Sequence, residues 1–542
     1  MSENERIKNV FPGEDGIPAA YKIEKQIQQK QYLVAGEIRL WEGACQEVVS
    51  PLHVTGKDGV VRPVILGCYP LLGEKEALEA LTAAEKAYGN GCGLWPTMPV
   101  EQRIRHMEIF IRKMIDKRQE IVKLLMWEIG KTLADSEKEF DRTVEYIRDT
   151  IEALKDQDRE ASRFILEQGI LAQVRRAPLG VVLCMGPFNY PLNETFTTLI
   201  PALIMGNAVV FKPPKLGVLL HYPLLAAFQE AFPPGVVNTV YGEGQQVIGP
   251  LMKSGGINVL AFIGSSRVAD ILKHQHPKPH RLRSVLGLEA KNAGIILADA
   301  DISQVVEEVI AGALTYNGQR CTALKILFVH NQIIDEFLKL FAAKVDQLAM
   351  GMPWEPGVKI TPLPEPDKCE YLRELIDDAG KHGAKVINTK GGLNYGSLFF
   401  PAILYPVNDK MRIYYEEQFG PVVPVIPFDD ISQPIQYVIH SSYGQQVSIF
   451  GTDADMLANL IDQLVNQVCR VNINSQCQRS PDSLPFTGRK DSAEGTLSVT
   501  DALRAFSIRT LVAAKTTPAN KKLITDIVKG DKSKFLSTDF LL

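Results

Sequence analysis

The residue best suited to covalent chemistry is Cys321, which lies in the polar segment GQRCTA. A neighbouring positive charge and nearby backbone N–H groups lower the pKa of a thiol, and the thiolate is the nucleophilic form. Arg320 supplies such a charge. The alternative is a small core residue, which is what most cysteines in an α/β protein are, and the other seven can be interpreted so. The polar neighbours of Cys321 favour a nucleophile.

Two further segments suit the binding of phosphate. Lys212 and Lys215 flank a Pro-Pro pair just past a buried strand, where two cations could hold a ribose and a 2′-phosphate. Gly264 and Ser265 would open a helix whose free N–H groups attract an anion. The fingerprint G-x-G-x-x-G is absent, so solvated lysines and plain strand-to-helix turns are the alternative interpretations.

The three histidines of KHQHPKPHR look like a metal site but do not predict one. Pro277 and Pro279 prevent a helix from aligning His274, His276 and His280, and no carboxylate or cysteine ligand is interleaved. We expect a solvated loop and no metal.

Alternating strands and helices position these segments. Short apolar runs predict buried parallel strands, and the helical stretches between them supply the crossovers of a doubly wound sheet. Ligands of such a sheet bind beyond the carboxyl ends of its strands. The predicted strands are 180–186, 207–213, 236–242 and 258–264, and the predicted helices are 191–205, 218–231 and 245–253.

A second alternating series begins after Asp301, with helix 303–315, strand 325–329 and helix 332–348. It predicts a second α/β domain from about residue 305. Charged amphipathic helices fill 75–154, and residues 1 to about 60 are polar with short strand-like pieces. The lysine-rich end from residue 515 indicates an arm or a partly ordered tail.

Composition excludes several classes of function. The 542 residues carry a net charge of -4, so no global positive field attracts nucleic acid or anionic lipid. The uncharged stretch 195–211 is interrupted by Pro201, Gly206 and Asn207, which favours a buried helix and strand over a membrane span. The first residues lack the apolar region of an export signal, and eight irregularly spaced cysteines suit a reducing cytosol. We expect a cytoplasmic protein.

The motifs together resemble the aldehyde dehydrogenase family over about residues 30 to 515. The resemblance implies an α/β fold with a Rossmann-type cofactor domain, a second α/β catalytic domain and a small β oligomerisation element. The segments that carry it, in chain order, are PFNYP (187–191), FKPP (211–214), FIGSS (262–266), LGLEAKN (286–292), LADAD (297–301), GQRCTA (318–323) and EEQFGPV (416–422).

Within the family the chain most resembles the non-phosphorylating glyceraldehyde-3-phosphate dehydrogenases. Their phosphate-binding positions are occupied here by Arg142, Tyr190, Arg320 and Arg479. Several donors converging on one dianion make a sensible phosphate clamp. The resemblance therefore implies oxidation of glyceraldehyde 3-phosphate to 3-phosphoglycerate, without an acyl phosphate.

The family's chemistry gives roles to matching positions. Cys321 would attack the aldehyde carbon, Asn189 and the Cys321 N–H would stabilise the oxyanion, hydride would pass to the nicotinamide, and water would hydrolyse the thioester. NADP is the expected cofactor, with NAD possible, because NAD-selective relatives often carry a glutamate at the place of Lys215. The implied cofactor contacts are Lys212, Lys215, Gly264, Ser265, Glu417 and Phe419.

One motif departs from the family. The loop that reads E-L-G-G-K in relatives reads G-L-E-A-K here, so Gly287 replaces the glutamate that activates water and Glu289 lies two residues later. We expect a local backbone shift to let Glu289 act as the base. Two alternatives stay open: a cofactor-binding relative with impaired hydrolysis, and a semialdehyde dehydrogenase whose arginines bind the carboxylate of another anionic aldehyde.

The resemblance also implies an assembly. Family members are usually homotetramers, joined through a hairpin that would lie at about 160–178 and a strand near 508–514. The expected division is a cofactor domain with its N-terminal helices over 1–304, a catalytic domain over 305–495, and an oligomerisation strand with the C-terminal tail over 496–542.

Overall fold

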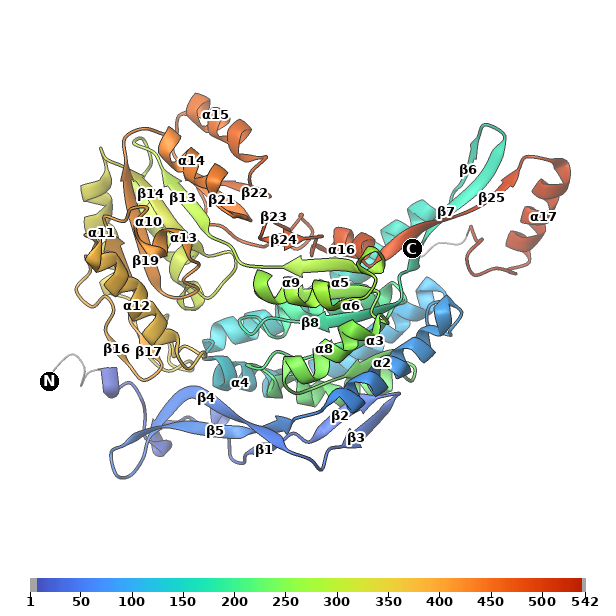
Figure 1. Cartoon of the computed structure of the whole chain (residues 1–542), viewed down its shortest axis with the longest axis horizontal. Coiled ribbons are helices and arrows are strands. Elements are labelled where there is room, and N and C mark those ends of the chain that lie inside the picture. Colours follow the sequence, from blue (N-terminus) through green and yellow to red (C-terminus); the bar gives the residue numbers. More distant parts are fainter. Residues whose placement is uncertain (1–6, 539–542) are drawn as a thin grey trace.

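The computed structural model describes residues 7–538 and contains two doubly wound α/β units (Figure 1). The first is built on a six-stranded sheet with the order β10-β9-β8-β11-β12-β24. All of its neighbours pair in parallel except β24, which pairs antiparallel with β12. Its strands are β8 (Val181–Met185), β9 (Ala208–Lys212), β10 (Val237–Thr239), β11 (Val259–Ile263), β12 (Arg283–Gly287) and β24 (Ala493–Glu494).

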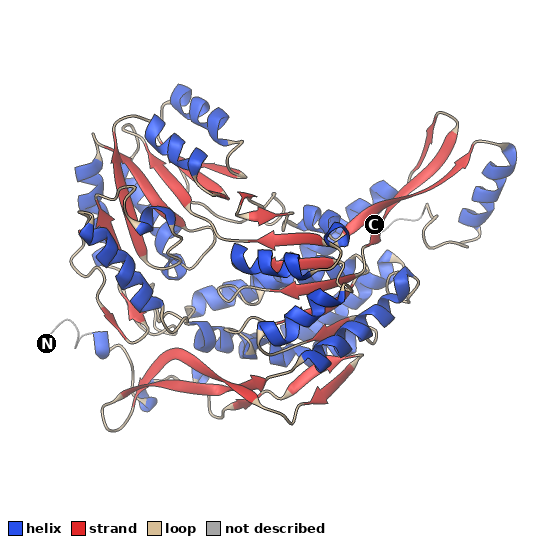
Figure 2. Ribbon diagram, viewed as in Figure 1, coloured by secondary structure: helices blue, strands red, loops and turns tan. Residues whose placement is uncertain are grey.

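Helices cover both faces of this sheet (Figure 2). The crossover helices lie in the stretches that the sequence predicts as helical. The uncharged stretch 195–211 forms the buried helix α6 and the buried strand β9 that follows it. His276, expected in a solvated loop, is instead buried, and its Nε2 lies 3.0 Å from the carbonyl oxygen of Ile257. The crossover helices are α6 (Asn193–Ile204), α7 (Leu225–Ala231), α8 (Gly244–Ser254) and α9 (Ser266–Gln275).

The N-terminal part adds helices and a long hairpin to the same core. Apolar residues at helical spacing pack inward from the charged helices, as predicted. The segment before them is more regular than expected, because β4 (Cys45–Thr55) and β5 (Val61–Pro70) pair antiparallel and β2 (Gln31–Val34) pairs with β3 (Glu37–Leu40). The helices are α2 (Glu74–Tyr88), α3 (Val100–Ile115), α4 (Arg118–Ile129) and α5 (Leu133–Ala161).

The second unit is a seven-stranded sheet with the order β15-β18-β19-β14-β13-β21-β22. The strand β13 precedes the expected boundary at residue 305, yet it pairs with β14 and β21 at the centre of this sheet. The sheet therefore begins before the expected boundary, and the functional division of the chain stays a prediction. Its strands are β13 (Asn292–Ile296), β14 (Leu324–His330), β15 (Lys385–Val386), β18 (Ala402–Tyr405), β19 (Val422–Phe428), β21 (Gln446–Phe450) and β22 (Arg470–Ile473).

Helices again cover this sheet, and the first of them, α10, follows β13 directly. Asp301 caps α10 by accepting hydrogen bonds from the backbone N–H groups of Ser303 and Gln304. The helices are α10 (Ile302–Leu314), α11 (Ile334–Asp346), α12 (Lys368–Lys381), α13 (Arg412–Tyr415), α14 (Ser432–His440) and α15 (Ala454–Leu464).

A third, smaller sheet extends away from both units (Figure 1). It pairs β6 (Phe164–Glu167) and β25 (Ser507–Lys515) with the two edges of β7 (Ile170–Pro178), and α16 (Val499–Ala505) leads into it. The lysine-rich end, expected to be an arm or a partly ordered tail, contains the helix α17 (Pro518–Lys529). No helix within residues 7–538 is both long and apolar enough to cross a membrane.

Candidate active site

Cys321 follows a turn with an unusual backbone. Tyr316, Asn317 and Gly318 have φ values of 51°, 54° and 70°, in the left-handed region that costs about 1–3 kcal/mol per non-glycine residue and clusters at functional sites. Asn317 fixes the turn through hydrogen bonds with Thr361. At Gly318 an added Cβ would lie 2.7 Å from the carbonyl oxygen of Ala313, so only glycine fits there. The nucleophile candidate is thus held on a rigid, strained support.

The expected lowering of the Cys321 pKa is wrong. Burial raises the pKa of the thiol to about 11, and the negative charge of Glu194 raises it further, against the opposing charges of Lys325 and Arg479. Arg320 does not turn toward the sulfur. Its Nη2 donates to the carbonyl oxygens of Ala311 and Gly312, at 2.9 and 2.8 Å, where α10 ends.

Asn189 lies beside the Cys321 segment. Its side-chain Nδ2 donates to the backbone carbonyl oxygen of Gln319 at 2.8 Å. The backbone carbonyl oxygen of Asn189 accepts a hydrogen bond from Lys131 Nζ, also at 2.8 Å. Lys131 forms a fully buried ion pair with Glu139, which also accepts hydrogen bonds from the backbone N–H groups of residues 192 and 193. Two buried charges that sequence patterns did not single out therefore fix the loop that carries the predicted oxyanion donor.

Two of the four predicted phosphate ligands share one carboxylate. Arg142 binds Asp482 with two hydrogen bonds of 2.9 and 2.8 Å, and Arg479 contacts the same carboxylate at 3.1 Å. Arg479 also forms a buried ion pair with Glu194. Burial alone would raise the pKa of Asp482, but the two guanidinium groups hold it below its usual value. The cluster holds two positive and two negative side chains, so its formal charge is zero.

Tyr190 and Arg320 are the other two predicted ligands. Burial raises the pKa of the Tyr190 phenol, whereas the positive charges of Arg320 and Arg142 act in the opposite direction. Lys131 Nζ lies over the ring of Tyr190, 3.5 Å from its centroid. Contacts therefore join Arg142 to Arg479, whereas Arg320 is linked to Tyr190 only through the effect of its charge and donates its hydrogen bonds to the end of α10.

The predicted cofactor residues of the first sheet lie at the carboxyl ends of its strands. Burial lowers the pKa of Lys212 to about 8, with Glu243 opposing and Lys215 adding to the shift. Ser265 caps α9, where its Oγ accepts from the N–H of Val268 at 3.4 Å. At the adjacent Gly264 an added Cβ would lie 2.3 Å from the ring of Phe262. The end of the sheet offers cations and helix N–H groups, as phosphate binding requires.

Glu289 lies at the same helix end. Its carboxylate accepts hydrogen bonds from the backbone N–H of Ser266 at 2.8 Å and from the Ser266 hydroxyl at 3.4 Å. These contacts direct it to α9 rather than to Cys321. Gly287, where relatives have the glutamate, leaves room for a side chain, since the atoms nearest to an added Cβ lie 3.4 Å away.

Glu417 and Phe419 close the site from the second unit. Glu417 forms an ion pair with Lys325 and accepts a hydrogen bond from the N–H of Ala290 at 3.2 Å. Lys291 donates to Gln418 Oε1 at 2.7 Å, which joins the same two loops. Phe419, with φ at 42°, sets its ring edge against Phe188, 5.8 Å between centroids. Loops from both units therefore meet around the predicted cofactor contacts.

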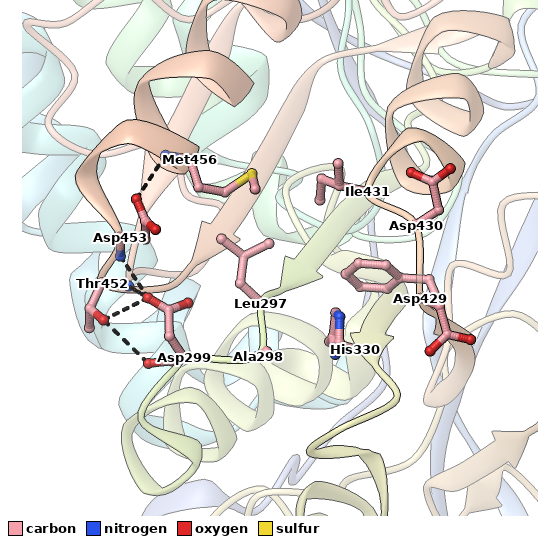
Figure 3. A pocket seen from close by; sticks show the side chains of 11 residues that line it. Leu297, Ala298, Asp299, His330, Asp429, Asp430, Ile431, Thr452, Asp453 and Met456 are labelled. Atoms are coloured by element: carbon pink, nitrogen blue, oxygen red, sulfur yellow. Dashed lines mark hydrogen bonds between the residues drawn. The ribbon is translucent and has the colours of Figure 1, made fainter.

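The carboxyl ends of the second sheet differ in charge. A cavity of about 690 Å³ lies there, beyond β13, β14, β19 and β21 (Figure 3). Asp299 accepts hydrogen bonds from the N–H groups of Thr452 and Asp453 at 2.7 and 2.6 Å, so a carboxylate already occupies the start of α15. With Asp429 and Asp430 also on its wall, this cavity repels a diphosphate. Of the two sheet ends, the first therefore favours a phosphate more than the second does.

Several residues of the site gave no signal in the sequence. Glu194 lies in an apolar run, and Lys131 and Glu139 lie in a charged helical region. Gln319 is fully buried, and within residues 7–538 neither of its side-chain amide atoms has a hydrogen-bond partner. Buried polar groups normally have partners, so this amide, two residues before Cys321, is available to a ligand or a water molecule.

The order and geometry of these motifs agree with a known family. A model of the aldehyde dehydrogenase family matches residues 60–512. The chain belongs to the aldehyde dehydrogenase family. The aldehyde dehydrogenase is thus an oxidoreductase that acts on aldehydes, and the resemblance inferred from its motifs is confirmed.

Relatives of this aldehyde dehydrogenase include enzymes with different substrates. It is 33% identical over 500 residues to NADP-dependent glyceraldehyde-3-phosphate dehydrogenase of Streptococcus equinus, covering 90% of this chain and 98% of that one. Lactaldehyde dehydrogenase of Methanocaldococcus jannaschii is 28% identical over 452 residues, covering 82% and 94%. The structure is also similar to a crystal structure, that of NADP-dependent glyceraldehyde-3-phosphate dehydrogenase from Bacillus halodurans C-125 complexed with NADP. The TM-score is 0.81 and the sequence identity is 30%, and the match covers 91% of this chain and 100% of that one. The α/β fold expected from the sequence is confirmed.

Proposed function

We propose that this aldehyde dehydrogenase oxidises glyceraldehyde 3-phosphate to 3-phosphoglycerate with NADP, through a Cys321 thioester and without an acyl phosphate. The observation that carries the proposal is that Arg142 and Arg479 meet at the carboxylate of Asp482, with the charge of Arg142 also acting on Tyr190 and that of Arg479 on the Cys321 thiol. Guanidinium groups recognise phosphate by paired hydrogen bonds. The relatives from Streptococcus equinus and Bacillus halodurans, named for this substrate and for NADP, support it.

NADP would be held at the carboxyl ends of the first sheet. At the start of α9 the N–H of Ser266 binds the carboxylate of Glu289, which a bound anion would have to displace, and Lys212 and Lys215 supply positive charge for a 2′-phosphate. Gly264, Ser265, Glu417 and Phe419 complete the proposed contacts. The cofactor, when bound, accepts the hydride. NAD is a weaker candidate because it lacks the phosphate that the two lysines would attract.

The chain's own residues would perform the remaining steps. The sulfur of Cys321 attacks the aldehyde carbon, and the Asn189 amide with the Cys321 N–H stabilises the oxyanion. Water then attacks the thioester carbon, the carbon–sulfur bond breaks and the carboxylate leaves. We propose Glu289 as the base for this water, which requires it to leave Ser266.

A second candidate function is favoured by the charge of the cluster. Because Glu194 and Asp482 already neutralise Arg479 and Arg142, the pocket also suits a monoanionic substrate, such as the carboxylate of a semialdehyde. A hydrolysis-impaired relative is the third candidate, favoured by Gly287 in place of the family glutamate.

Location and assembly complete the proposal. We propose a cytoplasmic enzyme, which the eight free cysteines support. We also propose a homotetramer joined through the outlying sheet, where Leu166 on β6 and Leu511 on β25 expose 63% and 59% of their surface.

Spectrophotometric reduction of NADP and NAD tests the function. Glyceraldehyde 3-phosphate, succinic semialdehyde and glyceraldehyde serve as substrates, with and without inorganic phosphate. We expect the fastest NADP reduction with glyceraldehyde 3-phosphate, independent of inorganic phosphate. A higher kcat/KM for the semialdehyde would favour the second candidate, and a single turnover followed by arrest would favour the third.

A further inference from the structure

Lys131 lies fully buried between the loop of the predicted oxyanion donor and the turn before the predicted nucleophile. Its ammonium group pairs with Glu139 of α5, whose side chain is also fully buried. Replacing a buried ion pair with well-packed apolar residues is often neutral or even stabilising, so stability alone does not explain a pair at this place. The contacts of the ammonium group give another reason.

On one side the ammonium group holds the loop of Asn189. Lys131 Nζ donates to the backbone carbonyl oxygen of Asn189 at 2.8 Å. One carboxylate oxygen of Glu139 binds the ammonium group, and the other accepts hydrogen bonds from the N–H groups of Leu192 and Asn193, at 3.0 and 3.1 Å. The ion pair therefore fixes the loop at Asn189 and again at the start of α6.

On the other side the ammonium group lies over two aromatic rings. It is 3.5 Å from the centroid of the Tyr190 ring and 4.5 Å from that of Tyr316, distances at which the face of a ring attracts a cation. Tyr316 belongs to the left-handed turn before Cys321, and its hydroxyl donates to the last carbonyl group of α4 at 3.0 Å. The ammonium group therefore joins the loop of Asn189 to this turn.

The side-chain amide of Asn189 depends on how these two segments are placed. One of its two N–H bonds donates to the backbone carbonyl oxygen of Gln319 at 2.8 Å, which leaves the second for an oxyanion. The direction of the second N–H is set by the position of the loop relative to the Cys321 segment. Lys131 contacts both sides of this junction.

We propose that Lys131 is a positioning residue of the oxyanion site, whose ammonium group, held by Glu139, directs the second Asn189 N–H toward the oxygen of the bound aldehyde. The inference rests on the proposed function in taking Asn189 as the oxyanion donor, and Lys131 acts only through it. An oxyanion forms twice, when the sulfur attacks the aldehyde and when water attacks the thioester. A misplaced donor therefore slows both steps.

Lys131→Met removes the charge and the hydrogen-bond donor while keeping an unbranched side chain of similar size. We expect the rate constant of the NADPH burst, the first turnover, to fall together with kcat by roughly 10- to 100-fold, since a misplacement of about 1 Å costs up to about 10²-fold. NADP is saturating, and the aldehyde is the one that the wild type oxidises best. A variant that is only less stable contains fewer folded molecules, which lowers the amplitude of the burst but not its rate constant.

A double-mutant cycle with Asn189→Ala tests whether Lys131 acts through Asn189. Asn189→Ala alone should lower the burst rate constant by roughly 10²–10³-fold, the usual cost of losing an oxyanion donor. In that background the amide is gone, so Lys131→Met should cause a further loss of less than about threefold. An equal loss in both backgrounds overturns the inference.

Two further variants separate positioning from stability. Lys131→Met with Glu139→Gln removes both charges and avoids the unpaired carboxylate, so it tests the inference if Lys131→Met fails to fold. It should keep the slow burst despite its recovered stability. Arg103→Met is the matched control, because Arg103 is another buried cation that donates to backbone carbonyl groups, those of Met98 and of Ile204 at the far end of α6. It should lower stability and leave the burst rate constant unchanged.

The failures are distinguishable. A burst rate constant in the double variant within about threefold of the wild type overturns the positioning role. An equal fall in Arg103→Met shows a general effect of destabilisation and overturns it as well. Absence of any aldehyde-dependent NADPH formation by the wild type, or an Asn189→Ala variant as fast as the wild type, is instead a failure of the proposed function.

Discussion

Replacing Lys215 with glutamate tests the assignment of the cofactor site. Lys215 is exposed beyond the end of β9, and its charge helps to depress the pKa of the neighbouring Lys212, so the two cations lie close enough to act on one anion. The 2′-phosphate of NADP carries about −1.5 to −2 charges, and a pair of unit charges 4 Å apart in water interacts by about 1 kcal/mol. Lys215→Glu changes the charge by two units, which gives about 3 kcal/mol before screening.

Salt reduces this value for an exposed group. With a screening length of about 10 Å at 0.1 M, we expect about 1–2 kcal/mol, or a loss of roughly 5- to 30-fold in kcat/KM for NADP. NAD has no charge at this position, so its kcat/KM should change little. At about 1 M salt, where the screening length is about 3 Å, the loss should shrink to roughly fourfold.

The assay is the ratio of kcat/KM for NADP to that for NAD, measured at both salt concentrations with the aldehyde that the wild type oxidises best. Lys381→Glu, an exposed charge reversal on α12 in the second unit, is the matched control and should leave the ratio unchanged. A ratio in Lys215→Glu equal to that of the wild type at low salt would refute the assignment of Lys215 to the 2′-phosphate.

Three further predictions follow from Lys131, Glu128 and Glu289. Lys131→Met should lower the free energy of unfolding by about 3–5 kcal/mol, because it leaves the buried charge of Glu139 without a partner. The double variant with Glu139→Gln should recover part of this loss in a melting experiment. Burial raises the pKa of Glu128 from 4.5 to about 7, so its protonation stabilises the fold below about pH 4.5, and this contribution is lost as the pH rises through 7. The wild type should therefore lose up to about 3 kcal/mol of stability between about pH 5 and pH 8 that Glu128→Gln does not lose. Equal pH profiles of melting for the two proteins would contradict this. Glu289→Gln should slow steady-state turnover and leave the NADPH burst intact, and wild-type values for both phases would show that another group activates the water.

The first sheet was predictable because its strands are short apolar runs that end in glycine or lysine. The predicted strand 207–213 and helix 191–205 match β9 and α6 to within a few residues. The strand β13 was harder to assign, since its apolar run lies only a few residues beyond β12 and nothing local shows that it pairs with β14 and β21 instead. Pairing between distant segments is not visible in a single sequence.

The positions of site residues were predictable where a motif fixes the backbone. They were not predictable where the direction of a side chain depends on contacts with distant segments. Asn189 lies beside the Cys321 segment as its motif implies. Arg320, next to Cys321 in the sequence, instead donates hydrogen bonds to the carbonyl groups of Ala311 and Gly312 near the end of α10. Glu194 gave no signal because a single acidic residue in an apolar run forms no repeating pattern. Its partner Arg479 is also 285 residues away in the sequence.

The pairing of Arg479 with Glu194 follows from a general constraint on anion sites. An unpaired guanidinium with 5% exposure would cost several kcal/mol, so a chain that buries Arg479 must supply an internal anion for it. Asp482 does this for Arg142 with 8% of its side chain exposed, and Glu194 does it for Arg479. Burial is the main reason why the pKa of the Cys321 thiol is raised, and the negative charge of Glu194 adds to the shift.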